Sequence, residues 1–281
     1  MKHSIASYGV AVGLMLLASP ASATTIGTDA FYNVNTVAYG PVSDQDGPYT
    51  AGAGSLLSYV AFGDSSSSFG DAVGSSSDGG GVAAGAFLIS DVDTNSMDFQ
   101  ASSSWSDSFV NTTGAAANYD FDFNFAGGNL SLDGNGGLAM FSLNVLLDGS
   151  SIWNRTASFA GNPSSTPPSL DSDGLAHSIF ASGNYVDVSF DPFSGNVDLG
   201  TIGAGDSFAL TYSVDVWVST TEDFSFAQAN VGDFPNPGFS GVVNPPIVVA
   251  PVPEPAGVVL LGLGLMGLAT RARKNKKRIH V

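Results

Sequence analysis

The chain has 281 residues, no cysteine and a formal net charge of −17. Arg155 is the one basic residue between Thr24 and Ala250, whereas this stretch holds 24 of the 25 acidic residues, a formal charge of −23. It therefore lacks the basic surface that a phosphate backbone requires, which excludes nucleic-acid binding. The carboxylates indicate a solvated surface or a requirement for salt or divalent cations.

The first 23 residues have the layout of a removable signal peptide. Lys2 precedes an apolar run from Ile5 to Leu17, and the small residues Ala21 and Ala23 fit the −3 and −1 positions of a signal peptidase site. The segment 1–23 is therefore predicted to direct export. A buried N-terminal helix is disfavoured, because the sequence turns abruptly polar after Ala23.

An apolar stretch ends in Ala61-Phe62-Gly63-Asp64-Ser65, which resembles the nucleophile block of GDSL-type esterases. Those enzymes activate the serine with a later Asp-x-x-His. Here His177 is the one histidine between Thr24 and Ala250, and Gly174 stands where the aspartate should be. We therefore expect no enzyme, and a secreted hydrolase that uses Ser65 and His177 is the disfavoured alternative.

Three stretches are predicted to be irregular. Gly63 to Gly81 is nearly all Ser, Gly and Asp, which is typical of a flexible loop, and Asn162 to Asp173 contains three prolines. Val231 to Pro246 is rich in Pro and Gly and is predicted to be a stalk that lifts the domain off a membrane.

Asp91, Asp93 and Asn95 form an Asp-x-Asp-x-Asn pattern that resembles the start of an EF-hand loop, in which side-chain oxygens bind calcium. The pattern then departs from that loop, with Ser96 at the sixth position and Ser102 at the twelfth. A calcium site and an ordinary solvated turn are both open interpretations.

The middle of the chain is predicted to form β-strands. Tyr119 to Phe125 alternates strictly between aromatic and polar residues, and Phe208 to Val218 alternates in the same way. Further candidates, separated by Gly-, Asn- and Asp-rich turns, are Val82 to Ile89, Leu138 to Leu147, Ser151 to Phe159, Ile179 to Ala181 and Tyr185 to Phe190. With no long helical pattern, the ectodomain, residues 24–246, is predicted to be all-β, an antiparallel β-sandwich of jelly-roll-like type.

Trp105, Trp153 and Trp217 are candidates for a sugar-stacking surface, although core packing is the favoured interpretation. Strict alternation places Trp217 opposite the apolar face of its strand, beside Asp215. The adjacent pair Glu222-Asp223 is a poor candidate for two glycosidase carboxylates, because neighbouring strand residues point to opposite faces.

The C-terminal tail has three parts in a fixed order. The proline-rich segment 247–255 contains Val252, Pro253, Glu254 and Pro255, and the apolar segment 256–270 follows it. Fifteen helical residues span about 22 Å, less than the hydrocarbon core of about 30 Å. The end of the chain, 271–281, is basic and predicted to be cytoplasmic, with a cluster comprising Arg271, Arg273, Lys274, Lys276, Lys277 and Arg278.

This order of Pro-Glu-Pro, short membrane helix and basic end resembles the PEP-CTERM sorting signal. The resemblance implies that an exosortase recognises and processes the tail, in Gram-negative bacteria that make exopolysaccharide. A plain C-terminal membrane anchor is the alternative.

The resemblance also implies a location and partners. We expect a non-enzymatic, structural or adhesive protein of the cell surface or extracellular matrix, whose partners are the exosortase during export and exopolysaccharide afterwards. A calcium-dependent carbohydrate-binding module is the alternative.

Overall fold

The computed structural model describes residues 24–36, 40–52, 54–63, 68–77, 80–91, 94–133, 136–161, 169–221, 225–233 and 236–244. This part of the chain contains no helix that could cross a membrane. It forms eighteen strands: β1 (Thr25–Thr36), β2 (Gly40–Ala51), β3 (Ser55–Gly63), β4 (Phe69–Ser77), β5 (Gly81–Ile89), β6 (Thr94–Val110), β7 (Ala117–Phe125), β8 (Gly128–Asp133), β9 (Gly137–Leu147), β10 (Ser150–Gly161), β11 (Ser169–Asp171), β12 (His177–Ser182), β13 (Tyr185–Phe190), β14 (Phe193–Ile202), β15 (Ser207–Thr220), β16 (Phe226–Asp233), β17 (Asn236–Pro237) and β18 (Phe239–Asn244).

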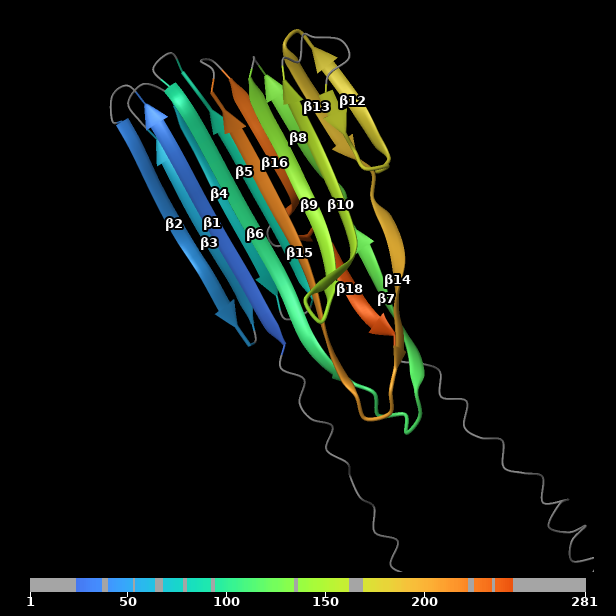
Figure 1. The fold of residues 1–281 in the computed structure, drawn as a ribbon. Coiled ribbons are helices and arrows are strands. Elements are labelled where there is room, and N and C mark those ends of the chain that lie inside the picture. Colours follow the sequence, from blue (N-terminus) through green and yellow to red (C-terminus); the bar gives the residue numbers. More distant parts are fainter. Residues whose placement is uncertain are drawn as a thin grey trace, which may run out of the picture. The chain divides into compact units, whose positions relative to one another are not determined.

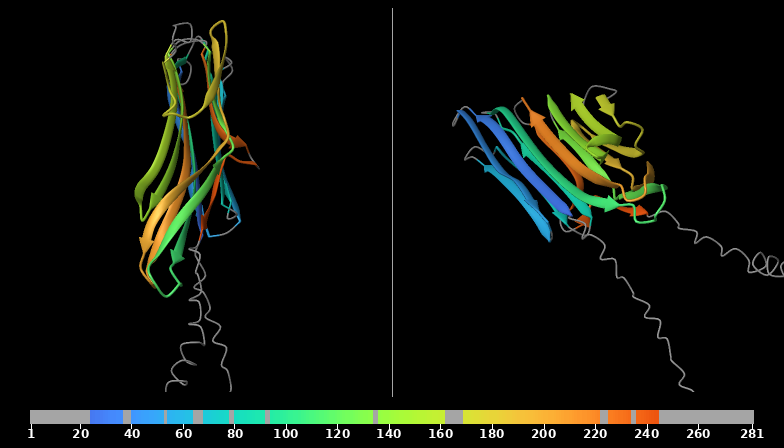
Figure 2. Two further views of the ribbon diagram at one scale, coloured as in Figure 1. Left: turned by 90° about the vertical axis from the view of Figure 1, so that its right-hand side faces the viewer. Right: turned by 60° about the horizontal axis from the view of Figure 1, so that its bottom comes forward.

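The strands form two antiparallel sheets that lie face to face in a sandwich-like arrangement (Figures 1 and 2). Sheet A has the order β11-β10-β9-β15-β6-β1-β2. Sheet B has the order β12-β13-β8-β16-β5-β18-β7-β14, and the β3-β4 hairpin extends it from β5. The all-β prediction is therefore confirmed. The expected signal peptide and the helix at 256–270 lie outside the described residues.

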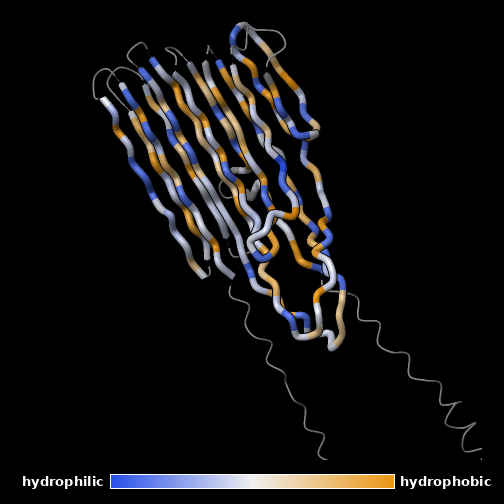
Figure 3. The backbone as a smooth tube through the Cα atoms, in the orientation of Figure 1, coloured by the Kyte–Doolittle hydropathy of each residue, from blue (hydrophilic) through white to orange (hydrophobic). Residues whose placement is uncertain are grey.

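Alternation along the strands creates the core (Figure 3). In β15 the residues from Phe208 to Val218 at every second position are at most 3% exposed, and β7 buries Tyr119, Phe121, Phe123 and Phe125. Both strands were predicted from their period of two.

One half of the interior is aromatic and centres on Tyr212 of β15. The Tyr212 ring stacks on Trp105 of sheet A at a centroid distance of 5.0 Å and on Phe121 of sheet B at 5.5 Å. Phe239 of β18 meets the same ring edge-on at 5.5 Å. The Tyr212 hydroxyl donates a hydrogen bond to the carbonyl of Gly80, so this buried polar group joins the two sheets.

The other half of the interior is built from small and hydroxyl-bearing residues. The Ser58 hydroxyl donates to Thr28 Oγ1 at 2.7 Å, and the Ser103 hydroxyl donates to the carbonyl of Ala83 at 2.6 Å. Both bonds cross from one sheet to the other and are buried. With such short side chains between them, the backbones of the two sheets approach closely in this half.

The predicted loop from Gly63 to Gly81 is therefore wrong over most of its described length, because Phe69–Ser77 is strand β4, paired with both β3 and β5. The glycines and serines of β4 fit the narrow gap between sheet B and sheet A. A Cβ on Gly74 would overlap the carbonyl oxygen of Ser102 and lie 3.1 Å from that of Asp29. A composition typical of flexible linkers here serves close sheet packing.

The predicted stalk is also wrong for its described residues. Val231 is fully buried in β16, and β18 pairs with β7 through six residues. Phe239 is 0% exposed and inserts between the sheets. Val231 and Phe239, two apolar residues of this segment, therefore belong to the core.

Replacing Tyr212 with Phe should lower the free energy of unfolding by about 1–3 kcal/mol, because the buried carbonyl of Gly80 loses its donor. Equilibrium urea unfolding of the full chain measures the change. Tyr49→Phe is the matched control, since Tyr49 is 46% exposed and its hydroxyl bonds to Asp46 at the surface. Equal losses in the two variants would contradict the role assigned to Tyr212.

Replacing Gly74 with Ala should cost about 1–3 kcal/mol, because the new methyl group has no room between the sheets. Gly63→Ala in the same hairpin is the control, because the atom nearest to its added Cβ is 3.9 Å away. Thermal unfolding of both variants checks this, and a Gly74→Ala protein as stable as the control would show that the sheets separate without cost.

Candidate functional site

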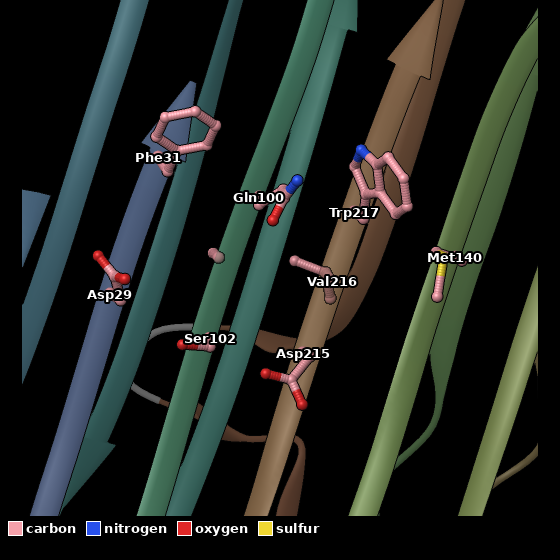
Figure 4. Close-up of a pocket in the computed structure, with 9 residues that line it drawn as sticks. Asp29, Phe31, Gln100, Ser102, Met140, Asp215, Val216 and Trp217 are labelled. Carbon is pink, nitrogen blue, oxygen red and sulfur yellow. The ribbon is translucent and has the colours of Figure 1, made fainter. Parts of the chain in front are cut away.

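The outer face of sheet A carries a groove with a volume of about 290 Å³. Four neighbouring strands, β1, β6, β15 and β9, supply its walls (Figure 4). The residues that line it are Asp29, Phe31, Gln100, Ala101, Ser102, Met140, Asp215, Val216 and Trp217. Most of them are the outward-facing residues of strands whose other face forms the core.

Strand register arranges these side chains in two parallel rows. Phe31 pairs with Gln100, Gln100 with Trp217, and Trp217 with Met140, which gives a largely apolar row across the four strands. Two residues further along each strand, Asp29 pairs with Ser102 and Ser102 with Asp215, which gives an acidic row. In Figure 4, Trp217 lies above Asp215 on β15, and Phe31 lies above Asp29 on β1, so the two aromatic residues are on the same side of the two carboxylates.

A hydrogen bond at one edge fixes the orientation of the Trp217 indole ring. Its Nε1 donates a hydrogen bond to Oδ1 of Asp98 on the neighbouring strand β6. Partial burial raises the pKa of Asp98, while the hydrogen bonds from Trp217 and Gln100 oppose this. The ring is thus oriented by a carboxylate outside the groove, and its face is left to line the groove.

The two carboxylates of the acidic row are positioned by amide and hydroxyl donors. The side-chain amide of Gln45 lies 3.1 Å from both carboxylate oxygens of Asp29. Asp215 accepts from the amide of Asn144 at 3.4 Å. Although the Asp215 side chain reaches solvent, the surrounding walls desolvate it and raise its pKa, against the effect of the bonds from Ser213 and Asn144.

A second, wider hollow of about 730 Å³ lies on the outer face of β7, β14 and β18. Its centre is Asp122, which accepts hydrogen bonds from the amides of Asn196 and Asn244. These donors lower the pKa of Asp122. The described lining includes no outward-facing aromatic residue, so this hollow lacks the aromatic ring face that the groove on sheet A offers to a ligand.

The structure separates the three tryptophans. Trp105 is buried at 9% exposure, and Trp153 packs on Phe123 at 4.6 Å, so both belong to the core as expected. Trp217 lies on the outer face, at the groove, where alternation placed it.

Of the candidate hydrolase residues, His177 is the one that lies within the described part of the chain. His177 lies exposed on β12, with Nδ1 2.9 Å from the carbonyl oxygen of Leu175. Ser65 and the pair Glu222-Asp223 lie outside the described residues.

The calcium pattern is only partly described. Asp91 follows β5 and Asn95 lies exposed in β6, while Asp93 lies outside the described residues. Among the residues that the structure describes, no three His, Cys, Asp or Glu side chains form a group that could hold a metal. The calcium site stays a prediction.

Most of the groove was not predicted, because Asp29, Phe31 and Gln100 lie on strands that the sequence did not reveal. β6 has three consecutive serines at its centre, from Ser102 to Ser104, and further serines at positions 106 and 108. The sequence feature that could have revealed β6 is the alternation of Met97, Phe99 and Ala101 with polar residues, which is the period of two expected for a strand.

The described residues thus define an all-β protein of two antiparallel sheets with a groove on one outer face. Residues 251–274 match the PEP-CTERM protein-sorting motif. The suspected resemblance is confirmed, and the tail carries the sorting signal of an exported protein that an exosortase processes at the membrane of Gram-negative bacteria. The site residues of the tail, from Val252 to Arg278, lie outside the described residues.

No curated protein matches the sequence. Two solved structures of infectious bursal disease virus, the Gx strain and T=1 particles, each share 12% identity with this chain. The matches cover 87% of this chain and 73% and 71% of theirs, with TM-scores of 0.13 and 0.12. Likeness at this level carries no argument about fold or function.

Replacing Asp98 with Asn should make stability less dependent on pH. Because burial raises the pKa of Asp98 above its ordinary value of 3.8, its contribution to stability is full below that value and is lost as pH rises through the folded-state pKa. Asn keeps an acceptor for Trp217 and carries no charge, so the variant should avoid this loss and be at least as stable as the parent at neutral pH.

Urea midpoints between pH 3 and pH 7 test this, with Asp133→Asn on an exposed part of β8 as the control for removing one charge. A pH profile of Asp98→Asn that matches the control would show that burial of Asp98 has no energetic effect.

Proposed function

We propose that this chain is an exported, non-enzymatic protein of the cell surface or extracellular matrix that binds exopolysaccharide in the groove on sheet A. The observation that carries the proposal is the row of Phe31 and Trp217 beside the row of Asp29 and Asp215. Ring faces pack against the apolar faces of sugars, and fixed carboxylates and amides accept and donate hydrogen bonds to hydroxyl groups. The groove therefore offers both kinds of contact that a sugar chain requires.

The open form of the groove also suits a polymer. Its walls are strands of one sheet, so a chain can enter and leave across the sheet without end groups being enclosed. The contact residues are carried on a rigid scaffold, which lowers the entropic cost of binding. A structural or adhesive role requires only such reversible contacts, repeated along the polymer and on many copies of the protein.

The sorting motif supports the location. A PEP-CTERM tail directs an exported protein to exosortase at the membrane. The formal charge of −23 between Thr24 and Ala250 suits a well-solvated protein outside the cell.

Replacing Trp217 with Ala should weaken binding to the exopolysaccharide of the source organism about tenfold or more, as expected for the loss of an aromatic anchor. Co-sedimentation of the full chain with the polymer measures this. Phe180→Ala, which removes a 61% exposed aromatic side chain from β12, is the control and should bind as the parent does.

The same experiment with calcium and with chelator separates the alternatives. Binding lost in chelator would favour the calcium-dependent module, with Asp91, Asp93 and Asn95 as the first ligands to replace. Polymer degradation that disappears in Ser65→Ala or His177→Ala would favour the hydrolase. Absence of binding in both conditions would overturn the glycan-binding proposal.

A further inference from the structure

Among the described residues that line the groove, two are acidic and none is basic. Asp29 and Asp215 line it, and Asp98 lies behind Trp217. Arg155, the one basic residue between Thr24 and Ala250, is absent from its lining. The guanidinium of Arg155 lies 5.5 Å over the ring of Trp153, and Nη1 is 3.7 Å from Asp173.

This charge would affect polysaccharides differently according to the charge that they carry. A uronate or sulfated chain would place its anions beside Asp29 and Asp215, with no described side chain in the groove to neutralise them. An ammonium group would gain from the same carboxylates, and the face of Trp217 attracts cations as well. Negative charge on the rest of the ectodomain acts in the same direction, because it repels polyanions and attracts polycations before contact.

The spacing of the acidic row fits a chain rather than a single sugar. Asp29 and Asp215 are separated by Ser102 on the strand between them. Two strand spacings place their backbones about 10 Å apart, so each carboxylate is available to a separate ammonium group. A polymer that crosses the strands can present amines on different sugar residues to the two carboxylates, while its ring faces lie along Phe31 and Trp217.

We propose that the groove selects an amine-bearing polysaccharide, a chain of amino sugars with free amino groups, over neutral and anionic polymers. The aromatic row contacts the sugar rings, and the carboxylates of Asp29 and Asp215 bind separate ammonium groups. This inference rests on the proposed function, because it names the class of glycan that the same groove binds.

The test compares polymers that differ only at the amine. The full chain is titrated with chitosan, with the same chitosan after complete N-acetylation, and with alginate as the polyuronate. We expect chitosan to bind about tenfold or more tightly than its acetylated form, and alginate not to bind. The preference should shrink as salt is added or as pH is raised until the amines are neutral.

Two double variants show whether the groove is responsible. Asp29→Asn with Asp215→Asn should abolish the preference, so that chitosan and its acetylated form bind with similar, weak affinity. Asp120→Asn with Asp133→Asn removes the same charge from exposed positions on β7 and β8 and should keep the preference. Equal effects of the two variants would show that bulk charge attracts chitosan, and this would overturn the inference.

The polymer comparison also distinguishes failure of the amine selectivity from failure of the proposed function. Equal affinity for chitosan and its acetylated form, or tighter binding of alginate, overturns the amine selectivity and leaves a glycan-binding groove. Failure of all these polymers and of the native exopolysaccharide to bind overturns both proposals.

Discussion

The packing around Tyr212 holds the two sheets together against the repulsion of the acidic surface. The chain has no cysteine, and Arg155 is the only partner for ion pairs with 24 acidic residues between Thr24 and Ala250. Cohesion therefore depends on apolar contact and on buried hydrogen bonds. The Tyr212 ring contacts Trp105, Phe121 and Phe239, and its hydroxyl bonds to the turn before β5, so four strands and a turn meet at one side chain.

The second half of the interior positions the groove. The carbonyls of Asp29 and Ser102, two residues of the acidic row, lie directly above Gly74 of β4. Small residues in sheet B therefore allow β1 and β6, which carry part of the groove, to pack close to β4. A side chain at position 74 would push these two strands away from sheet B.

The sequence could predict the strands whose buried residues are large. β7, β13 and β15 alternate Phe, Tyr, Val and Leu with polar residues, and this pattern is unambiguous. It could not predict β4 or the centre of β6, where small residues such as Gly74, Ala101 and Ser103 occupy buried positions and the composition is typical of a flexible segment. Hydrophobic periodicity carries little signal when the gap between two sheets is too narrow for large side chains.

The residues of the candidate site likewise divide into those that the sequence could predict and those that it could not. Trp217 and Asp215 were found because strict alternation places them on the face of β15 opposite its apolar residues. Asp29, Phe31 and Gln100 were not found, because a groove across four strands depends on pairing between segments far apart in the chain, which one sequence does not reveal. The tail needed no such pairing, since its residues act in their order along the chain.

The position of β18 has a mechanical consequence. β1 begins and β18 ends at the same end of the sandwich, and β18 lies antiparallel to β7 through six residue pairs (Figure 1). Tension applied along this last strand would shear all of its hydrogen bonds to β7 at once, instead of opening them one after another. Phe239, at the far end of the strand, would have to leave the core at the same time. A pulling force on the last described strand would therefore be resisted by the core of the protein.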